Sequence, residues 1–184
     1  MDKNQNWQQL ISLGIDEAAE RLKELTDSSI QVKIPALTTA EAVDCPLQLK
    51  EQFGSQLISV TELPFSGELE GVAQLLFSQK NALELTAMLT GEEPNSPEFE
   101  ELKEEALTEV GNIVLNSVIG EVSNQLNQNL AFSVPIYREV KIVDLLTTYA
   151  LETQATIVLG NASFAIEQLA ITGEIVLLFK HQIN

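Results

Sequence analysis

The chain has 184 residues and a formal net charge of −17, from 27 acidic and 10 basic residues. This length suits one domain or two small halves that share a core, and the acidic balance argues against binding to nucleic acids or anionic membranes, which both need basic surface. No apolar run approaches the roughly 20 residues of a membrane span, and the N-terminus has no apolar signal region. The single cysteine, Cys45, excludes an intramolecular disulfide, so we expect a cytoplasmic protein.

Hydrophobic periodicity predicts the elements of the first half. The polar stretch between the first two strands is expected to be a loop that can hold short structure, and Gly91 is expected to end the last helix as its C-cap. In chain order, the predicted elements are a helix at 6–26, a strand at 30–37 that Pro35 interrupts, a loop at 38–54, strands at about 55–62 and 67–77 joined by a turn through 64–67, and a helix at about 79–90.

The second half begins with a linker and a long helix. Ser96 is a good N-cap residue, and Pro97 suits the first helical position. The predicted elements are the linker at 92–97, the long helix at 98–127, a strand at 131–140 that Pro135 interrupts, an ambiguous stretch at about 141–150, and strands near 154–169 and 171–180.

The two halves resemble each other, since residues 30–35 match 130–135 and each half predicts helix, strand, long connection and two strands. We therefore expect a single α+β domain over 1–184, built from two pseudo-repeats at about 6–91 and 97–182. The pseudo-two-fold fold would pack two long helices on a mostly antiparallel sheet of about six strands. The second half has no counterpart of the helix at 79–90, and formation of a homodimer would cover the apolar surface left open.

The long helix carries a polar stripe between two apolar faces. Glu105, Glu109, Asn112 and Asn116 recur at i, i+4, i+7 and i+11, on one side of the helix. When both neighbouring apolar faces are packed, such a polar stripe remains accessible at the surface. Here it carries two carboxylates and two amides.

Two of these residues, with a distant proline, form a recognisable motif. Glu109 and Asn112 lie in the segment Glu-Val-Gly-Asn-Ile, and Pro135 follows Asn112 after 22 residues. This spacing resembles the signature of the CheC/CheX/FliY family of response-regulator phosphatases from bacterial chemotaxis: Asp or Ser, three residues, Glu, two residues, Asn, 22 residues and Pro. Glu105 holds the Asp or Ser position and so departs from the signature.

The motif occurs once. The matching positions of the first helix hold Gln9 and Ser12, which looks like a lapsed site. The chain is therefore more similar to single-site CheX-like members, which are dimers, than to two-site CheC. A FliY-type flagellar switch subunit is the lesser expectation, because such proteins carry additional domains.

The resemblance implies an enzyme that hydrolyses the aspartyl phosphate of a CheY-like receiver protein. Because an amide donates and accepts hydrogen bonds at once, Asn112 would orient the attacking water. Glu109 would pair with the receiver's lysine. The receiver brings its own Mg²⁺, so no cofactor or metal of the chain itself is expected. Glu105, Asn116 and Pro135 are expected to support this pair.

Two alternatives remain open. The chain could be a binding module of the same fold that docks on a receiver or a CheD-like deamidase without hydrolysing anything, or the stripe could be ordinary solvated surface. The acidic run at 98–105 is predicted to be a solvated helix start, with steering of a basic partner as the lesser reading. His181 and Cys45 are expected to form neither a metal site nor a nucleophile.

Overall fold

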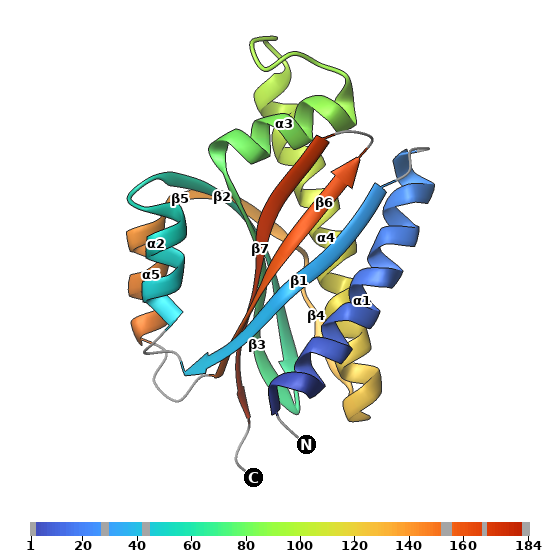
Figure 1. Cartoon of the computed structure of the whole chain (residues 1–184), viewed down its shortest axis with the longest axis vertical. Coiled ribbons are helices and arrows are strands. Elements are labelled where there is room, and N and C mark those ends of the chain that lie inside the picture. The colour runs from blue at the N-terminus through green and yellow to red at the C-terminus, as the bar shows by residue number, and fades with distance from the viewer. Residues whose placement is uncertain (1–2, 27–29, 42–44, 152–155, 167–168, 182–184) are drawn as a thin grey trace.

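The computed structural model describes residues 3–26, 30–41, 45–151, 156–166 and 169–181 (Figure 1). The helices are α1 (Lys3–Thr26), α2 (Cys45–Phe53), α3 (Gln79–Thr90), α4 (Phe99–Leu126) and α5 (Ile142–Leu151). The strands are β1 (Ile30–Glu41), β2 (Leu57–Gly67), β3 (Leu69–Ser78), β4 (Leu130–Phe132), β5 (Ile136–Lys141), β6 (Thr156–Ile166) and β7 (Leu169–His181).

The seven strands form one sheet in the order β1-β6-β7-β3-β2-β4, and β5 also pairs with β2. Every described strand pair is antiparallel. The predicted α+β fold with two long helices on an antiparallel sheet is confirmed. The sheet has one strand more than expected, because the segment predicted at 131–140 divides into β4 and β5.

The order of elements is similar in the two halves. The series α1, β1, α2, β2, β3 is followed, after α3, by α4, β4 with β5, α5, β6, β7. The pairings match as well, because β1 lies against β6, β5 lies against β2, and β3 meets β7 at the centre. The division into pseudo-repeats at 6–91 and 97–182 stays a prediction, which this order of elements supports.

The two prolines of the matching strands both interrupt strand pairing. The register of β1 against β6 shifts between Lys33 and Ala36, on either side of Pro35. Pro135 lies between β4 and β5, which pair with different parts of β2. Proline has no backbone N–H to donate, so it is found where a bulge or a break relieves the ladder.

The expected turn at 64–67 is wrong. β2 runs through Pro64 to Gly67, and the chain reverses only before β3 begins at Leu69. The carbonyl of Pro64 accepts a hydrogen bond from the N–H of Ser133, so this side of Pro64 faces the gap between β4 and β5. A strand residue directs its N–H and C=O to the same neighbour, and the missing donor therefore costs no bond to β3.

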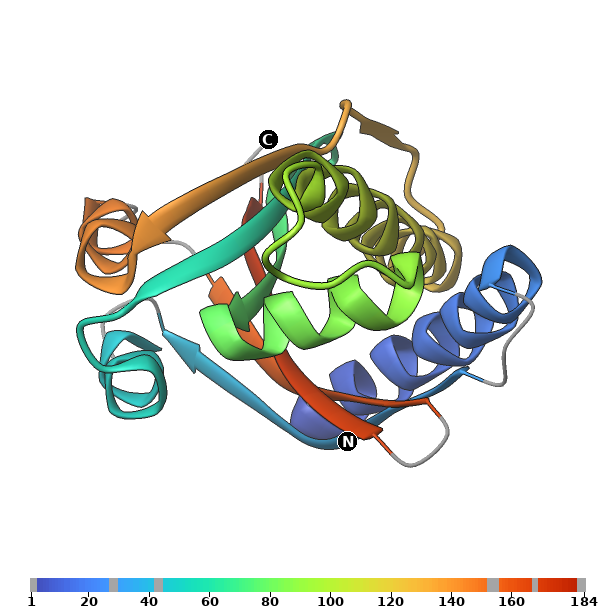
Figure 2. The ribbon, with the colours of Figure 1, turned by 90° about the horizontal axis from the view of Figure 1, so that it is seen from above.

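Helices cover both faces of the sheet, as Figure 2 shows: α1 and α4 lie on one side, and α2 and α5 lie on the other. Each side has its own core cluster of buried aliphatic and aromatic side chains. The larger cluster includes Ile11, Ile15 and Leu22 of α1, Leu107, Val110 and Val114 of α4, and Leu63, Leu75, Phe77 and Ile175 of the sheet. The smaller cluster includes Leu49 and Phe53 of α2, Ile142 and Leu145 of α5, and Ile58, Val176 and Leu178 of the sheet.

The second helical layer comes from two stretches whose structure the sequence left open. The stretch 38–54, expected to be a loop that can hold short structure, includes the end of β1 at Glu41 and the helix α2, and the ambiguous stretch 141–150 forms most of α5. These two helices are short, and they contribute to the core through few side chains, such as Leu49 and Leu145. A helix of this length is marginal alone and is stabilised by packing, which local periodicity does not report.

The helix ends differ in how well sequence predicted them. Gly91 is the C-cap of α3 with φ 74°, as expected, and Ser78 caps its start by accepting a hydrogen bond from the N–H of Asn81. The prediction that Ser96 caps the long helix is wrong, since α4 begins at Phe99. Ser96 contributes its backbone carbonyl, which accepts from the N–H of Phe99 at 3.1 Å.

Candidate functional site on α4

α4 lies close to the sheet at Gly111, in the middle of the motif. A Cβ atom at this position would lie 2.4 Å from Cγ2 of Thr61, in β2. The hydroxyl of the same threonine donates a hydrogen bond of 2.9 Å to the carbonyl of Leu107. Because Gly111 faces the sheet, Glu109 and Asn112 are turned toward the other sides of the helix, and neither is fully buried.

The four stripe residues lie on α4 as one continuous row. Glu105 and Glu109 are exposed, and Asn112 and Asn116 are half-buried. The row thus runs from two exposed carboxylates in the first half of the helix into two amides near its middle. This order sets a charged end beside a neutral end that can donate and accept hydrogen bonds.

The two amides are joined to each other. Nδ2 of Asn116 donates a hydrogen bond of 2.8 Å to the backbone carbonyl of Asn112 and another of 2.6 Å to its Oδ1. The i, i+4 spacing allows this contact, because side chains one turn apart on a helix face each other. The sequence predicts Asn116 only as a supporting residue of the motif pair, and the structure gives it a bond to Asn112 within α4.

Hollows of the surface border the two carboxylates on both sides. One, of about 370 Å³, lies between α3 and α4 and combines both carboxylates with an apolar floor; another, of about 630 Å³, is almost wholly acidic. A cationic side chain with an aliphatic stem fits the first of these in both charge and polarity. The first hollow is lined by Leu89, Thr90, Leu102, Glu105, Ala106, Glu109 and Val110, and the second by Glu101, Glu104, Glu105, Thr108 and Glu109.

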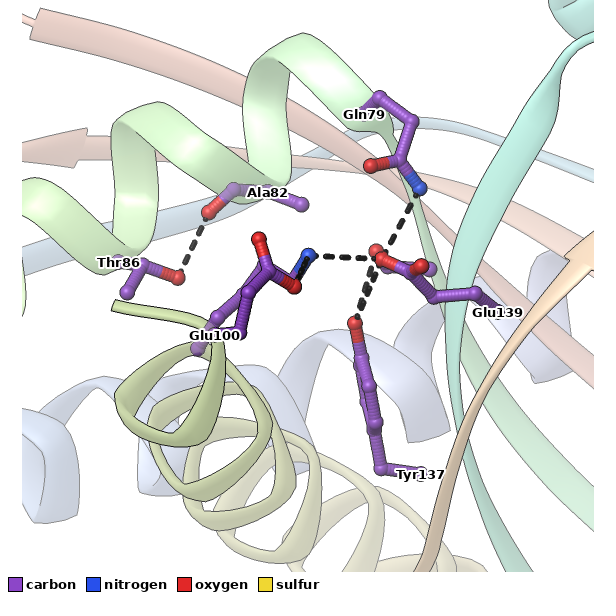
Figure 3. Close-up of polar contacts among 8 residues, drawn as sticks. Gln79, Ala82, Thr86, Glu100, Tyr137 and Glu139 are labelled. Atoms are coloured by element: carbon purple, nitrogen blue, oxygen red, sulfur yellow. Dashed lines mark hydrogen bonds and ion pairs between the residues drawn. The ribbon is translucent and has the colours of Figure 1, made fainter. Parts of the chain in front are cut away.

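The start of α4 is tied to β5 and α3 by a polar cluster around a buried lysine. The side chain of Lys103 is only 5% exposed, and its Nζ lies 2.6 Å from Oε2 of Glu100 and 2.9 Å from Oε1 of Glu139. Glu139 also accepts hydrogen bonds of 3.2 Å from Nε2 of Gln79 and from the hydroxyl of Tyr137, as Figure 3 shows. This lysine cluster connects three elements at the end of α4 from which the stripe begins.

The cluster shifts three pKa values. Burial alone would lower the pKa of Lys103, but its bonds to Glu100 and Glu139 outweigh burial and raise it above 10.5. Burial alone would raise the pKa of Glu139, but the bonds from Lys103 and Gln79 prevail and lower it below 4.5. Burial raises the pKa of Tyr137 to about 12, against the weaker opposing effect of its bond with Ser59. At neutral pH the cluster therefore holds a charged pair and a neutral phenol.

The burial of Lys103 was not predicted from the sequence, although a signal was present. Lys103 follows Phe99 by four residues and precedes Leu107 by four, so it takes a place in the buried stripe of α4. The acidic residues around it are exposed, as predicted for a solvated helix start. A lysine in register with buried apolar residues indicates a paired cation, because an unpaired buried charge is very costly.

The remaining predicted residues lie on other elements than α4. Pro135 is half-buried at the break between β4 and β5. Gln9 is exposed and Ser12 half-buried on α1. Among the residues that the structure describes, no group of three His, Cys, Asp or Glu side chains could hold a metal ion. No described helix is long and apolar enough to span a membrane. His181 is at the end of β7, and nothing is described of its side chain.

The fold is shared with solved structures of chemotaxis and flagellar proteins. The chain is similar to FliY of Thermotoga maritima (18% identity, TM-score 0.73, covering 94% of this chain and 88% of that chain). It is similar to the CheX–CheY complex with BeF3 and Mg²⁺ from Borrelia burgdorferi (15% identity, TM-score 0.58, covering 92% of this chain and 97% of that chain). It is also similar to the FliM–SpeE complex of H. pylori (10% identity, TM-score 0.63, covering 98% of this chain and 90% of that chain). At these identities the likeness shows the fold alone.

A protein-family model identifies the family of this chain, which structural likeness at these identities does not. A comparison with curated protein sequences yields no match. The model of the chemotaxis phosphatase CheX matches residues 60–153, just over half of the chain, and this range contains α4 with the whole polar stripe. The chain therefore belongs to the CheX family of chemotaxis phosphatases, within the wider group of CheC, CheX and FliY proteins.

Proposed function

We propose that this protein is a phosphatase that hydrolyses the aspartyl phosphate of a CheY-like response regulator. The observation that carries the proposal is the arrangement of exposed Glu109 and hydrogen-bonded Asn112 one turn apart on the accessible row of α4, in a chain of the CheX family. The solved CheX–CheY complex supports a receiver as the partner, since its fold is shared by this chain.

The chemistry asks little of the enzyme beyond positioning. An aspartyl phosphate is a labile acyl phosphate, so a water held in line with phosphorus is enough to accelerate its hydrolysis. Asn112 would accept a hydrogen bond from this water at Oδ1 and direct the water oxygen toward phosphorus. The water oxygen bonds to phosphorus as the bond between phosphorus and the aspartyl oxygen breaks. The aspartate carboxylate leaves with the electron pair, and inorganic phosphate keeps the oxygen and both protons of the water.

Glu109 would fix the docking geometry. Its carboxylate is exposed and borders the hollow between α3 and α4, where a cationic side chain is favoured. The lysine of the receiver is such a group. Because Glu109 and Asn112 belong to one rigid helix, contact of Glu109 with the lysine would bring the amide of Asn112 to the phosphoryl group in the same step.

The proposed reaction needs no metal or cofactor from this chain. Mg²⁺ would be bound by the receiver and would offset the charge of the phosphoryl group. The substrate implies a cytoplasmic location. A homodimer also stays a prediction.

The test is hydrolysis of phosphorylated receivers. Receivers are phosphorylated with acetyl phosphate and mixed with the protein, and loss of phosphate is followed. We expect Asn112→Ala to lower the acceleration by roughly a hundredfold or more, because the water loses its positioning group. Asn124→Ala, which changes an exposed amide of the same helix, is the matched control and should keep full activity. Full activity of Asn112→Ala, or no acceleration with any cognate receiver, would refute the proposal.

Glu109→Ala tests the docking contact separately. We expect both weaker binding of the receiver and a lower rate, since the lysine contact would order the complex. An unchanged apparent affinity would argue against the contact with lysine.

The second candidate is a binding module without catalysis. It is favoured by the departure at Glu105 from the family signature and by the likeness to the FliM–SpeE complex of H. pylori. A module of this kind would bind a receiver or a CheD-like protein with a measurable affinity, and it would leave the rate of phosphate loss unchanged.

A further inference from the structure

We propose that Asn116 is a positioning residue that fixes the side-chain amide of Asn112 in one orientation, with Oδ1 toward Asn116 and Nδ2 toward the incoming substrate. The catalytic consequence rests on the proposed phosphatase function, whereas the orientation itself rests on the geometry of α4.

The backbone contact determines how the two amides are turned. One atom of the Asn116 amide lies 2.8 Å from the backbone carbonyl of Asn112, which can only accept a hydrogen bond, so this atom must be the nitrogen. The same nitrogen lies 2.6 Å from the side chain of Asn112, and its second hydrogen needs an acceptor there. The contacted atom of Asn112 is therefore Oδ1 rather than Nδ2.

The amide of Asn112 has no other described constraint. The terminal torsion of asparagine is broad and roughly two-fold, so an isolated side chain exchanges its oxygen and nitrogen between the two sides. Both side-chain hydrogen bonds that Asn116 makes within the described part of the chain go to Asn112. Asn116 thus restricts the rotation of Asn112 before any partner binds.

This orientation suits the proposed reaction. Oδ1 of Asn112 keeps a second lone pair, which can accept a hydrogen bond from the attacking water. Nδ2 points away from Asn116, and its two hydrogens are available for a phosphoryl oxygen or for the oxygen of the water. If the amide were reversed, the acceptor and the donors would exchange places and the water would lose its orientation. Such preorganisation lowers the ordering cost at the moment of reaction.

Two variants of Asn116 separate the loss of the bond from its reversal. Asn116→Ala removes the donor and leaves the amide of Asn112 free to rotate. Asn116→Asp has nearly the same shape, but its carboxylate can only accept, so it favours the reversed amide with Nδ2 toward itself. Asn124→Asp adds the same charge at an exposed position of the same helix and is the matched control.

The kinetic readout is the division of the effect between kcat and KM with a phosphorylated receiver. We expect kcat to fall roughly five- to tenfold in Asn116→Ala, in line with one lost hydrogen bond, and further in Asn116→Asp, while KM stays close to that of the parent. The control should keep the parent's kcat. Circular dichroism before and after the assay shows that each variant is folded. Parental kcat in both Asn116 variants would overturn this inference and leave the phosphatase function standing.

The orientation is also measured without any receiver. Relaxation of ¹⁵N at the side chain of Asn112, identified by the signals lost in Asn112→Asp, reports the order of its amide. We expect an ordered amide in the parent and a clearly lower order parameter in Asn116→Ala. Equal order in the two proteins would overturn the inference. If the phosphatase function fails, the parent protein accelerates hydrolysis in no receiver, and Asn116 then has no catalytic role. The relaxation measurement still decides whether Asn116 orients the amide of Asn112.

Discussion

Gly111 of α4 lies directly against Thr61 of β2, so closely that a Cβ on the glycine would meet the threonine side chain at 2.4 Å. The contact falls between Glu109 and Asn112 in the motif. A glycine at this point lets the helix approach the sheet, and the approach determines how far the polar row stands out from the surface. The lack of a side chain at Gly111 therefore helps to determine how the candidate catalytic residues are placed relative to the core.

Gly111→Ala should destabilise the protein. Its Cβ has to displace Thr61 or lift the helix, and overpacking of this kind costs about 1–3 kcal/mol, from which the better helix propensity of alanine recovers up to about 1 kcal/mol. Gly120→Ala is the matched control in the same helix, because no described atom lies within 4 Å of its Cβ position, and it should stabilise by up to about 1 kcal/mol. Urea unfolding of both variants measures the difference. Equal stabilisation by the two changes would contradict the close approach.

Lys103→Met should weaken the attachment of α4 to β5. The change removes a buried cation and leaves Glu139 with fewer partners, and because both carboxylates of the cluster retain solvent contact we expect a cost of about 1–3 kcal/mol. Lys80→Met is the control, since Lys80 is 81% exposed and pairs with Glu84 at 3.8 Å. That change should cost at most about 0.5 kcal/mol. Thermal or urea unfolding checks both values, and similar effects for the two lysines would contradict the buried cluster.

The contribution of the lysine cluster to stability should depend on pH at both extremes. The pKa of Glu139 is lowered below 4.5 in the folded state, so its contribution is complete above pH 4.5 and is lost as the pH falls through the folded pKa. The pKa of Lys103 is raised above 10.5, so its contribution is complete below pH 10.5 and is lost as the pH rises through the folded pKa. The difference in unfolding free energy between the parent and Lys103→Met should therefore be constant between these values and shrink outside them. A difference that changes between pH 6 and 9 would refute this account.

Tyr137 should ionise at a higher pH than an ordinary tyrosine. Burial raises its pKa from 10.0 to about 12, so its phenol should remain neutral at pH 11 as long as the protein is folded. The absorbance of phenolate during an alkaline titration measures this directly, with circular dichroism as the check on folding. The chain has two tyrosines, and Tyr137→Phe should remove the component that ionises near pH 12. A titration in which that component persists in Tyr137→Phe would show that the assignment is wrong.

Glu105→Gln should weaken receiver binding through charge alone. Glu105 is exposed, lies one turn before Glu109 and borders the same hollows, so its carboxylate adds to the field that attracts a cationic group. We expect KM to rise roughly two- to fivefold at low salt and by less at about 0.5 M salt, where charges at this distance are screened. Steady-state assays at the two salt concentrations give the comparison, with Glu121→Gln, farther along α4, as the control. A rise in KM that salt leaves unchanged would point to direct contact instead.

Much of the fold was predictable from local patterns. The periodicity of α1 and α4, the cap at Gly91 and the prolines at 35 and 135 act within a few residues of chain, so their effects are visible without tertiary contacts. The motif that led to the family, with Glu109 and Asn112 one turn apart, also depends only on spacing along a helix.

Other features required the folded chain. α2 and α5 are helices because Leu49, Ile142 and their neighbours pack on a sheet assembled from both halves. Lys103 is buried because β5 brings Glu139 to it, from 36 residues further along the chain. Neither could be predicted from local propensity, since the partner groups are distant in sequence.

The sequence by itself determined that the motif residues share one row of a long helix, since the spacing of side chains along a helix is a property of the backbone alone. The tertiary structure decided which parts of that helix stand free. Gly111 against Thr61 and Lys103 against Glu139 fix how α4 lies on the sheet, and that placement leaves Glu105 and Glu109 exposed. The hydrogen bond from Asn116 to Asn112 depends on both the sequence and the tertiary structure. Helical spacing permits the bond, and the packing that leaves both amides half-buried favours it over hydrogen bonds to water.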